Sequence, residues 1–321
     1  MDARAPETGP ASAASPDAPL SPGETSPPVS PPDPGEEAPA ATVEALSPKD
    51  SGYTVDTEWG ERVNEYGIQV ESISVADDGT LYIMDPGRSL INKLSSTGEL
   101  ELQWPFNGAP AWGSDYGFGI GVRPDGELIY ALTYSGDIQV FWSNGNAETL
   151  WHTPVPKWAG SISVGERRVY VAEAGLFDFL PDGDLIAVRS RCSGRSLNCL
   201  AVAASPDAIY VIGTLSDGPA SVLKLDEWAR PIWEWGDDGI VELPAEDPLF
   251  PWDLAVSDEG EVYVTDGRFL QRIDSEGNLI APWEFEGDPH FSPCYVDLDA
   301  AGNIYVADWI SPILKLEPPA P

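Results

Sequence analysis

The sequence predicts an all-β fold: a six-bladed β-propeller of four-stranded antiparallel blades behind a proline-rich tail. Three observations support this prediction. A strand–turn–strand unit recurs six times, with a tyrosine at the same place every 40 to 53 residues. That period, with apolar residues alternating along each strand, is typical of propeller blades. Glycine (31 residues) and proline (32 residues) are abundant, which favours short strands and turns over long helices.

Residues 1–50 form the predicted tail, an acidic segment rich in Pro, Ala and Ser. It holds 12 of the 32 prolines and no aromatic residue. Such a segment cannot bury enough apolar surface to offset its chain entropy, so we expect it to be disordered and extended. A tail of this kind suits a tether that holds a domain away from a surface.

The repeating domain is predicted to span residues 53–317. Each unit has an inner strand, a turn that in most units contains Asp-Gly or Glu-Gly, and a second strand with the anchoring tyrosine. The six tyrosines are Tyr82, Tyr130, Tyr170, Tyr210, Tyr263 and Tyr305. A second hairpin follows in each unit, which gives four strands per blade.

The sixth unit stops near residue 316, before an outer strand can form. Residues 53–60 are similar to the outer strand predicted at residues 231–236. We therefore expect the N-terminal segment to complete the last blade and close the ring, because closure removes exposed sheet edges.

Tryptophans recur on the predicted outer strands, one per blade, where we expect them to pack between neighbouring blades. They are Trp59, Trp104, Trp151, Trp235 and Trp283. Four acids end the second strand of their units and are predicted to cap turns by accepting backbone N–H bonds. They are Asp85, Glu173, Asp266 and Asp308.

Three segments carry a family resemblance: residues 78–85, 259–266 and 301–308. They resemble the NHL-repeat and SMP-30/gluconolactonase-like group of six-bladed propellers, over residues 53–316. Units 3 and 4 depart from the pattern, since neither contains the Asp-Gly turn. The resemblance implies the architecture but not one activity, because that group includes lactonases, lyases and binding scaffolds.

The charge balance is strongly acidic, with 53 acids against 17 bases and a formal net charge of −36. This argues against nucleic acid and anionic lipid as partners. No apolar run approaches the roughly 20 residues of a membrane span, so none is expected. The start at residues 1–4 lacks an apolar signal. We expect an exported mature form, periplasmic or on the cell surface and tethered through its N-terminus as in a lipoprotein, with a cytoplasmic location as the alternative.

Three cysteines also favour export. Cys192 and Cys199 bracket a short polar segment and are a possible disulfide, which leaves Cys294 over. The alternative is that all three are reduced and buried.

Catalytic signatures are sparse. The chain has two histidines, His152 and His290, so a zinc site of three histidines is impossible. We expect His152 at the surface, whereas His290 could reach one mouth of the ring. No Gly-x-Ser-x-Gly, Walker A or His-Glu-x-x-His motif occurs. Enzymatic activity is therefore uncertain, and the sequence leans against it.

The family resemblance implies one candidate metal site. Related lactonases hold a divalent cation in the central channel through acids and amides near the starts of inner strands. The matching positions are Glu71, Asn198, Asp253 and Asp297. Hard cations such as Ca²⁺ take six to eight oxygen ligands, to which these four side chains would contribute if they converge on the axis. The alternative is that chance places acids near the mouth of so acidic a chain.

Aromatic residues precede several inner strands or follow Asp308, and they form a candidate ligand or partner surface with His290. They are Trp112, Trp158, Trp252, Tyr295 and Trp309. Aromatic rings beside acids suit a sugar, a cationic or proline-rich peptide, or a protein partner, and plain packing is the alternative.

The leading functional hypothesis is a non-enzymatic binding or assembly scaffold, exported and tethered, with a protein partner. The first alternative is a divalent-metal-dependent hydrolase of the lactonase or esterase type. The second is a carbohydrate-binding module that uses the mouth aromatics.

Overall fold

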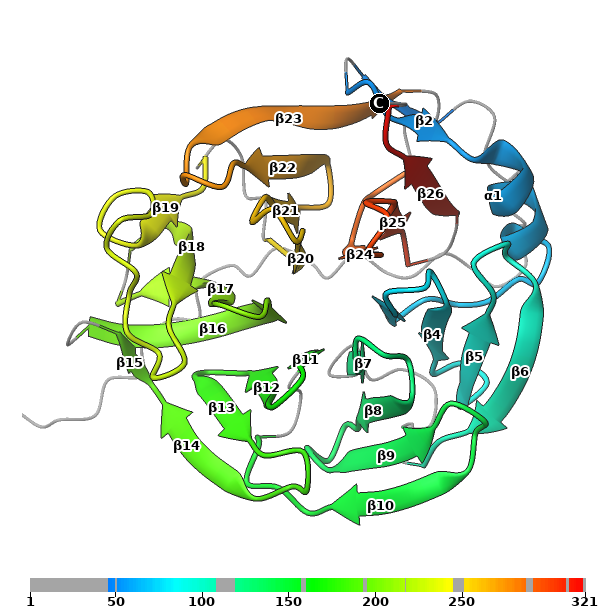
Figure 1. Ribbon diagram of the computed structural model, residues 1–321, viewed down its shortest axis with the longest axis horizontal. Helices are drawn as coiled ribbons and strands as arrows, with labels where there is room; N and C mark the ends of the chain where they lie inside the picture. Colours follow the sequence, from blue (N-terminus) through cyan, green and yellow to red (C-terminus); the bar gives the residue numbers. More distant parts are fainter. Residues whose placement is uncertain are drawn as a thin grey trace, which may run out of the picture. The chain divides into compact units, whose positions relative to one another are not determined.

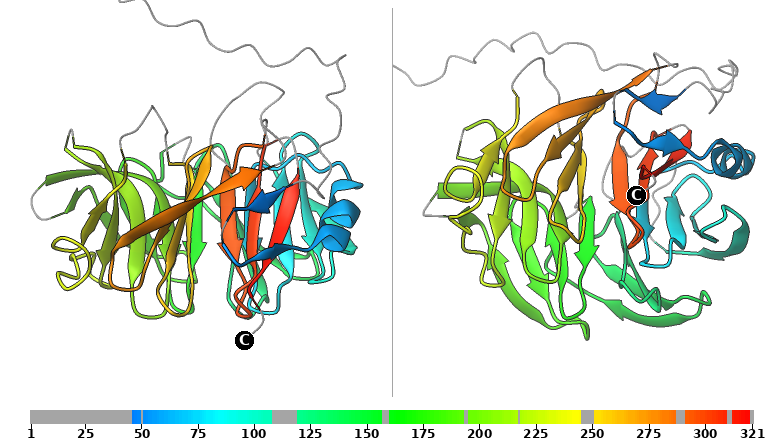
Figure 2. Two further views of the ribbon diagram at one scale, coloured as in Figure 1. Left: turned by 90° about the horizontal axis from the view of Figure 1, so that it is seen from above. Right: turned by 45° about the horizontal axis from the view of Figure 1, so that its top comes forward.

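The computed structural model describes residues 46–49, 51–107, 119–156, 160–192, 195–216, 218–244, 251–286, 291–309 and 312–319. They belong to one compact unit, Ala41–Pro321. Residues 1–45, most of the predicted tail, lie outside the described residues. Six antiparallel sheets stand around a central axis, which confirms the predicted propeller (Figure 1). Seen from the side, the blades form a low ring (Figure 2).

Blades 1 to 3 follow one another along the chain, each running from the axis outward. Blade 1 consists of β3 (Ser72–Val75), β4 (Leu81–Asp85), β5 (Leu90–Leu94) and β6 (Leu100–Pro105). Blade 2 consists of β7 (Gly119–Val122), β8 (Leu128–Leu132), β9 (Ile138–Trp142) and β10 (Ala147–Trp151). Blade 3 consists of β11 (Ser161–Val164), β12 (Val169–Ala172), β13 (Leu176–Phe179) and β14 (Leu185–Arg189).

Blades 4 to 6 carry additions to this plan. Blade 4 consists of β15 (Arg191–Cys192), β16 (Arg195–Ala204), β17 (Ile209–Leu215), β18 (Ala220–Leu225) and β19 (Ile240–Glu242). Blade 5 consists of β20 (Asp253–Val256), β21 (Val262–Thr265), β22 (Phe269–Ile273), β23 (Leu279–Glu286) and β1 (Ser47–Pro48). Blade 6 consists of β24 (Tyr295–Leu298), β25 (Ile304–Ala307), β26 (Ile313–Glu317) and β2 (Thr54–Val55).

The N-terminal segment closes the ring, as predicted, but within residues 53–60 only β2 (Thr54–Val55) is a strand. Thr54 pairs with Glu317 and Val55 pairs with Leu316. The chain then enters α1 (Thr57–Asn64), because the Asp56 carboxylate caps the helix by accepting a hydrogen bond from the backbone N–H of Trp59 at 3.0 Å. The prediction of an outer strand through residue 60 is therefore wrong beyond Val55.

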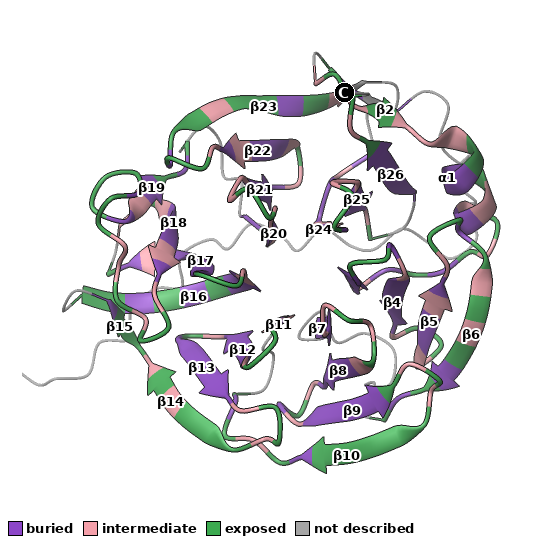
Figure 3. Ribbon diagram, in the orientation of Figure 1, coloured by how far each residue is buried: buried purple, intermediate pink, exposed green. Residues whose placement is uncertain are grey.

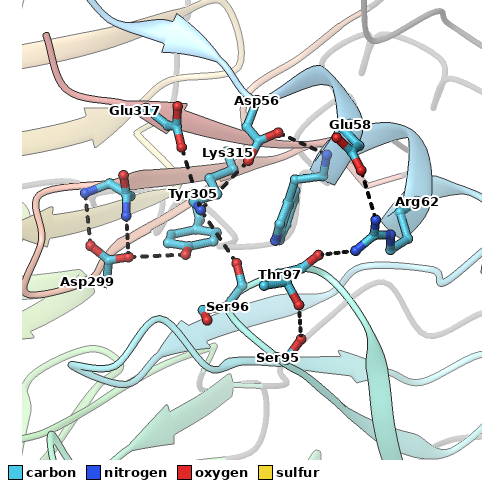
Figure 4. Close-up of polar contacts among 12 residues, drawn as sticks. Asp56, Glu58, Arg62, Ser95, Ser96, Thr97, Asp299, Tyr305, Lys315 and Glu317 are labelled. Carbon is cyan, nitrogen blue, oxygen red and sulfur yellow. Dashed lines mark hydrogen bonds and ion pairs between the residues drawn. The ribbon is translucent and has the colours of Figure 1, made fainter. Parts of the chain in front are cut away.

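Polar contacts hold α1 between blades 6 and 1 (Figure 4). Arg62 donates to the backbone carbonyl of Thr97 at 2.8 Å, and the Lys315 ammonium lies 3.8 Å from the Asp56 carboxylate. Lys315 is itself buried at 9% exposure. Among the described residues α1 is the one helix, and no described helix is long and apolar enough to cross a membrane.

The predicted packing of tryptophan between blades is confirmed, and each of the five rings is at most 6% exposed. Each lies 5.4 to 6.4 Å from the anchoring tyrosine of its blade: Trp59–Tyr305, Trp104–Tyr82, Trp151–Tyr130, Trp235–Tyr210 and Trp283–Tyr263. Two of them do not lie on outer strands as predicted: Trp59 is in α1, and Trp235 is in a turn between β18 and β19.

Most of these indoles also press against a glycine in the third-to-fourth-strand turn of the next blade. A Cβ on Gly183 would lie 2.8 Å from Trp151, and one on Gly145 would lie 3.3 Å from Trp104. Gly98 and Trp59, and Gly277 and Trp235, form the same pairs. We call this arrangement the Trp–Gly contact. A side chain on the glycine would displace the indole, so the two residue types belong together.

The predicted turn caps are confirmed for three of the four acids. Asp85 and Asp266 are buried and accept backbone N–H bonds from the residues that follow them, and Asp308 accepts from the backbone of Ser292. For Glu173 the structure shows burial instead, which raises the pKa of its carboxyl.

Candidate functional site

The side chains of inner strands link neighbouring blades around the channel. Ser72 and Ser74 of β3 accept hydrogen bonds from the backbone of Ile120 and Val122, both at 3.1 Å. In β11, serines at the matching positions accept from β16. These bonds are Ser161 with Val202 at 3.0 Å and Ser163 with Ala204 at 2.9 Å.

Two of the predicted metal ligands occupy these same strand positions. Asp253 accepts from the backbone N–H of Val296 at 3.2 Å, and Asp297 accepts from Val75 at 2.7 Å. The second oxygen of each carboxylate accepts the N–H of its own next residue at 2.9 Å. Both oxygens of each acid are therefore already engaged with the backbone of blades 5, 6 and 1.

Burial changes the protonation of these two acids. Desolvation raises the pKa of Asp253 to about 8, with the backbone bond from Val296 opposing it. Desolvation likewise raises the pKa of Asp297 to about 6. Near neutral pH, Asp253 is thus often protonated, which weakens it as a ligand for a hard cation.

The structure does not assemble the predicted four-oxygen set. Glu71 precedes β3, whereas Asn198 lies in the N-terminal part of β16, which runs out toward the rim beside β15 (Figure 1). Within the described ranges, no three His, Cys, Asp or Glu side chains are placed to hold a metal ion. The residues therefore do not fit the Ca²⁺ site that the family resemblance implies.

Three of the predicted mouth aromatics lie together where blades 5 and 6 meet. Trp252 and Trp309 are each 44% exposed, and their rings stand edge to face at 5.1 Å. Tyr295 begins β24 beside them, and burial, with Glu71 nearby, raises the pKa of its hydroxyl well above the ordinary value. Trp112, Trp158 and His290 fall outside the described residues.

No disulfide joins Cys192 and Cys199, although both are buried in the paired strands β15 and β16. Burial raises the pKa of Cys199 to about 12, and Cys192 adds to the effect. Cys294 is buried too, and its pKa is also raised to about 12. His152 is at the surface, as expected, 3.3 Å from the Asp137 carboxylate.

The repeat breaks at the outer part of the interface between blades 3 and 4. Strand pairing sets Trp104, Trp151 and Trp283 opposite Ile91, Ile138 and Leu270 of the third strands. The matching residue of blade 3, Leu176, has Arg189 opposite it. An arginine thus stands where other blades carry the packing tryptophan.

The facing turn of blade 4 changes as well. Ala229 donates its N–H to the Asp226 carbonyl at 2.8 Å, just as Gly98 and Gly145 donate within their turns. Its φ of 55° is a left-handed conformation that an alanine adopts only with strain. Both members of the Trp–Gly contact are therefore replaced at this one interface.

A groove of about 560 Å³ opens where the contact is lost. We call it the rim groove; its lining residues are Val188, Arg189, Ser190, Arg191, Trp228, Ala229, Arg230, Pro231 and Trp233. Among these lining residues, Val188 of β14 is 50% exposed, and Trp228 and Trp233 on the other side are 57% and 55% exposed. Figure 3 shows β14 exposed to intermediate beside buried β13.

A second cavity of about 570 Å³ adjoins the rim groove and shares Ser190 and Arg191 with it. Ala174 and Ser216 line this cavity with φ of 47° and 59°. Together with Ala229, they are three of the five described non-glycine residues with positive φ. Backbone strain concentrates at functional sites more than elsewhere, so this clustering favours a binding role for the region.

The groove is also a local basic region on an acidic protein. Arg189, Arg191 and Arg230 line it and are three of the 17 bases in the sequence. Arg230 stacks on Trp228 at 4.8 Å and pairs with Asp226 at 2.7 Å. Arg191 is exposed, and no ion pair to it occurs within the part of the chain that the structure describes. An arginine without an acid in so acidic a chain is available to a partner.

Comparison with known proteins supports the fold and leaves the family open. No protein-family model and no curated protein matches the sequence. Kuenenia stuttgartiensis hydrazine synthase aligns with a TM-score of 0.54 at 13% identity, over 77% of this chain and 95% of the other. Virginiamycin B lyase from Staphylococcus aureus with quinupristin gives 0.53 at 14% identity, over 76% and 79%. The RRP9 WD40 repeats give 0.54 at 10% identity, over 85% and 99%. At these identities the likeness shows a β-propeller and nothing about activity.

Sequence reasoning missed the rim groove. The sequence does carry a signal, which is the lack of two recurring residue types. The outer strand at residues 185–189 has no tryptophan, and the turn at residues 226–230 has no glycine. Neither absence points to a surface until strand pairing shows that Arg189 and Ala229 occupy equivalent places.

Proposed function

We propose that this propeller is a non-enzymatic protein-binding scaffold and that its partner binds at the rim groove. One observation carries the proposal: the Trp–Gly contact is replaced by Arg189 and Ala229, and apolar side chains are exposed where it would be. On soluble proteins, an interaction site differs from ordinary surface in that its exposed apolar residues are contiguous and have a polar border.

The composition of the groove supports a protein partner. Tryptophan and arginine are the residues most enriched among those that dominate binding energy, and here Trp228, Trp233 and three arginines lie together. We propose further that the chain belongs to the NHL-repeat or SMP-30-like group and is exported and tethered through its N-terminus.

A mouth site is the second candidate, favoured by the exposed pair Trp252 and Trp309. Two exposed indoles could stack on a sugar, as a carbohydrate-binding module requires. The pair provides the matched control for the rim groove, because it also consists of two exposed tryptophans on the same chain.

The test uses the full chain in three forms as bait for proteins of the native source: the unaltered chain, Trp228→Ala/Trp233→Ala, and Trp252→Ala/Trp309→Ala. The proposal predicts a partner that binds the unaltered chain and the mouth variant but not the rim variant. A partner that is lost from the mouth variant and kept by the rim variant would overturn it. Turnover of an ester or lactone that the mouth substitutions abolish would equally count against a scaffold.

A further inference from the structure

The outer strand of blade 3 has an unprotected edge. Within the described residues, β14 is the last strand of its sheet: β13 pairs with its inner edge, and no strand pairs with its outer edge. In blade 5, by contrast, the N-terminal strand β1 pairs with the outer strand β23. Unpaired backbone N–H and C=O groups on such an edge can accept a strand from another chain.

β14 carries few of the side chains that usually prevent such pairing, and its one charged residue, Arg189, is at its end. The edge strand β6 exposes Glu101, Gln103 and Pro105, and a charge or a proline on an edge opposes strand addition. In β14 the sequence is Leu-Ile-Ala-Val before Arg189, with no proline and no acid. Exposed apolar residues on an open edge favour the addition of a strand with apolar residues of its own.

The arginines around β14 favour a partner segment that carries negative charge. Arg189 ends the strand, Arg191 follows it, and Arg230, which pairs with Asp226, lies across the groove. Because the whole sequence has 53 acids against 17 bases, these guanidinium groups form a basic region that an acidic segment would reach with favourable electrostatics.

We infer that the partner bound at the rim groove supplies an extended, acidic segment of about five residues, which adds to β14 as a further strand. This inference rests on the proposed scaffold function and names the partner's chemistry. Val188 and Arg189 point to opposite faces of β14, so the apolar side chains of the segment lie on the face of Val188. The carboxylates of the segment lie on the other face and pair with Arg189 and Arg191.

Two other occupants fit less well. A second copy of the chain would set the same arginines against one another and join two molecules of net charge −36. Eleven of the chain's first 45 residues are proline, which interrupts the row of backbone N–H donors that an added strand supplies.

The experiment uses the full chain and short synthetic peptides. The probe alternates Glu and Val over seven residues, and its charge control has Lys in place of Glu. A third peptide has the probe sequence with alternate backbone nitrogens methylated, so that one edge cannot donate hydrogen bonds. Binding is measured by calorimetry, and hydrogen exchange follows the amides of residues 185–189.

The inference predicts that the acidic probe binds, that the basic control binds at least about tenfold more weakly, and that binding slows exchange in β14. Methylation of the donating edge should abolish binding. The variant Arg189→Glu/Arg191→Glu should reverse the preference between the two peptides, whereas Trp252→Ala/Trp309→Ala should leave it unchanged.

Each contrary result is specific. Equal binding of the methylated peptide would overturn strand addition, and equal or stronger binding of the basic peptide to the unaltered chain would overturn the acidic partner. In the free monomer, protection of those β14 amides that do not bond to β13 would show that the chain covers its own edge, and protection of the same amides that rises with self-association would show a second copy there. All of these outcomes leave the scaffold function standing. That function fails on the outcomes given for it above: a native partner that is indifferent to the rim variant, or an ester or lactone turnover that the mouth substitutions abolish.

Discussion

The interface between blades 2 and 3 and the interface between blades 3 and 4 are built on the same plan and differ at two residues. In the first, Trp151 is 6% exposed, packs on Tyr130 at 5.4 Å and leaves no room for a Cβ on Gly183. In the second, Arg189 and Ala229 take the places of tryptophan and glycine, and a groove of about 560 Å³ results. The same two positions thus stabilise the interface between blades 2 and 3 through packing, and leave a groove at the interface between blades 3 and 4.

The difference is confined to the outer part of the blades. Near the channel, the interface between blades 3 and 4 keeps its hydrogen bonds from Ser161 and Ser163. The ring therefore stays closed although the groove opens at its rim, because hydrogen bonds between the inner strands still join blades 3 and 4.

The largest expected effect separates the two interfaces by stability. Trp151→Ala should lower the free energy of unfolding by about 3–5 kcal/mol, since it removes a buried indole and leaves a cavity. Arg189→Ala, at the matching place, should lower it by less than about 1 kcal/mol, because that side chain is partly exposed. Urea denaturation of both variants measures this, and equal losses would break the comparison.

A second prediction concerns pH and the acids that join blades 5, 6 and 1. The raised pKa values of Asp253 and Asp297 mean that the folded state holds their protons more tightly than the unfolded state, whose carboxyls titrate near pH 4. Their contribution is fully present below pH 4 and is lost as the pH rises through 6 and 8. Stability should therefore fall across this window by several kcal/mol.

The control for that prediction copies the other blades. Asp253→Ser and Asp297→Ser introduce serine at these positions. In blade 1 the equivalent residues, Ser72 and Ser74, are serines, and each accepts a hydrogen bond from a backbone N–H. Together they should flatten the dependence between pH 4 and 8 in denaturant titrations. An unchanged slope would show that the general charge of the chain, rather than these two acids, sets the dependence.

A third prediction restores the missing contact. Arg189→Trp/Ala229→Gly should raise the free energy of unfolding by about 1–2 kcal/mol, because an indole then packs over Tyr170 and the strained alanine is removed. Thermal and urea unfolding should both show the gain. A loss of stability would mean that blade 3 cannot accommodate the ring, and the two interfaces would not be equivalent.

The smallest effect isolates the backbone. Ala229→Gly alone should stabilise the protein by about 0.5–1 kcal/mol, since glycine adopts a φ of 55° without strain. Ala187→Gly on the neighbouring strand is the control and should destabilise, because glycine weakens a strand. If both substitutions act in the same direction, strain at Ala229 does not explain the result.

Several features of the fold followed from the sequence because they recur. The anchoring tyrosines, the turn glycines and the buried tryptophans repeat in the chain, and repetition reveals a period that strand pairing then explains. The helix α1 was missed because the outer-strand similarity of residues 53–60 hid a local signal, the capping Asp56 three residues before Trp59.

Site residues were harder to predict, for two different physical reasons. Asp253 and Asp297 looked like channel ligands, but a strand position decides whether a carboxylate faces the channel or the next blade, and only pairing shows it. The rim groove arises from residues 188–191 and 228–233, which are distant in sequence and each unremarkable alone. Trp252, Tyr295 and Trp309, by contrast, meet as their positions before or after strands suggested.

The most direct test of the central claim is the affinity of Arg189→Trp/Ala229→Gly for the partner that the unaltered chain captures, measured by calorimetry on the full chain. If the rim groove exists for binding, this variant folds, resists denaturant at least as well, and loses the partner by at least about tenfold in affinity. If the stabilised variant binds the partner as tightly as the unaltered chain, the missing Trp–Gly contact is not what makes the binding surface.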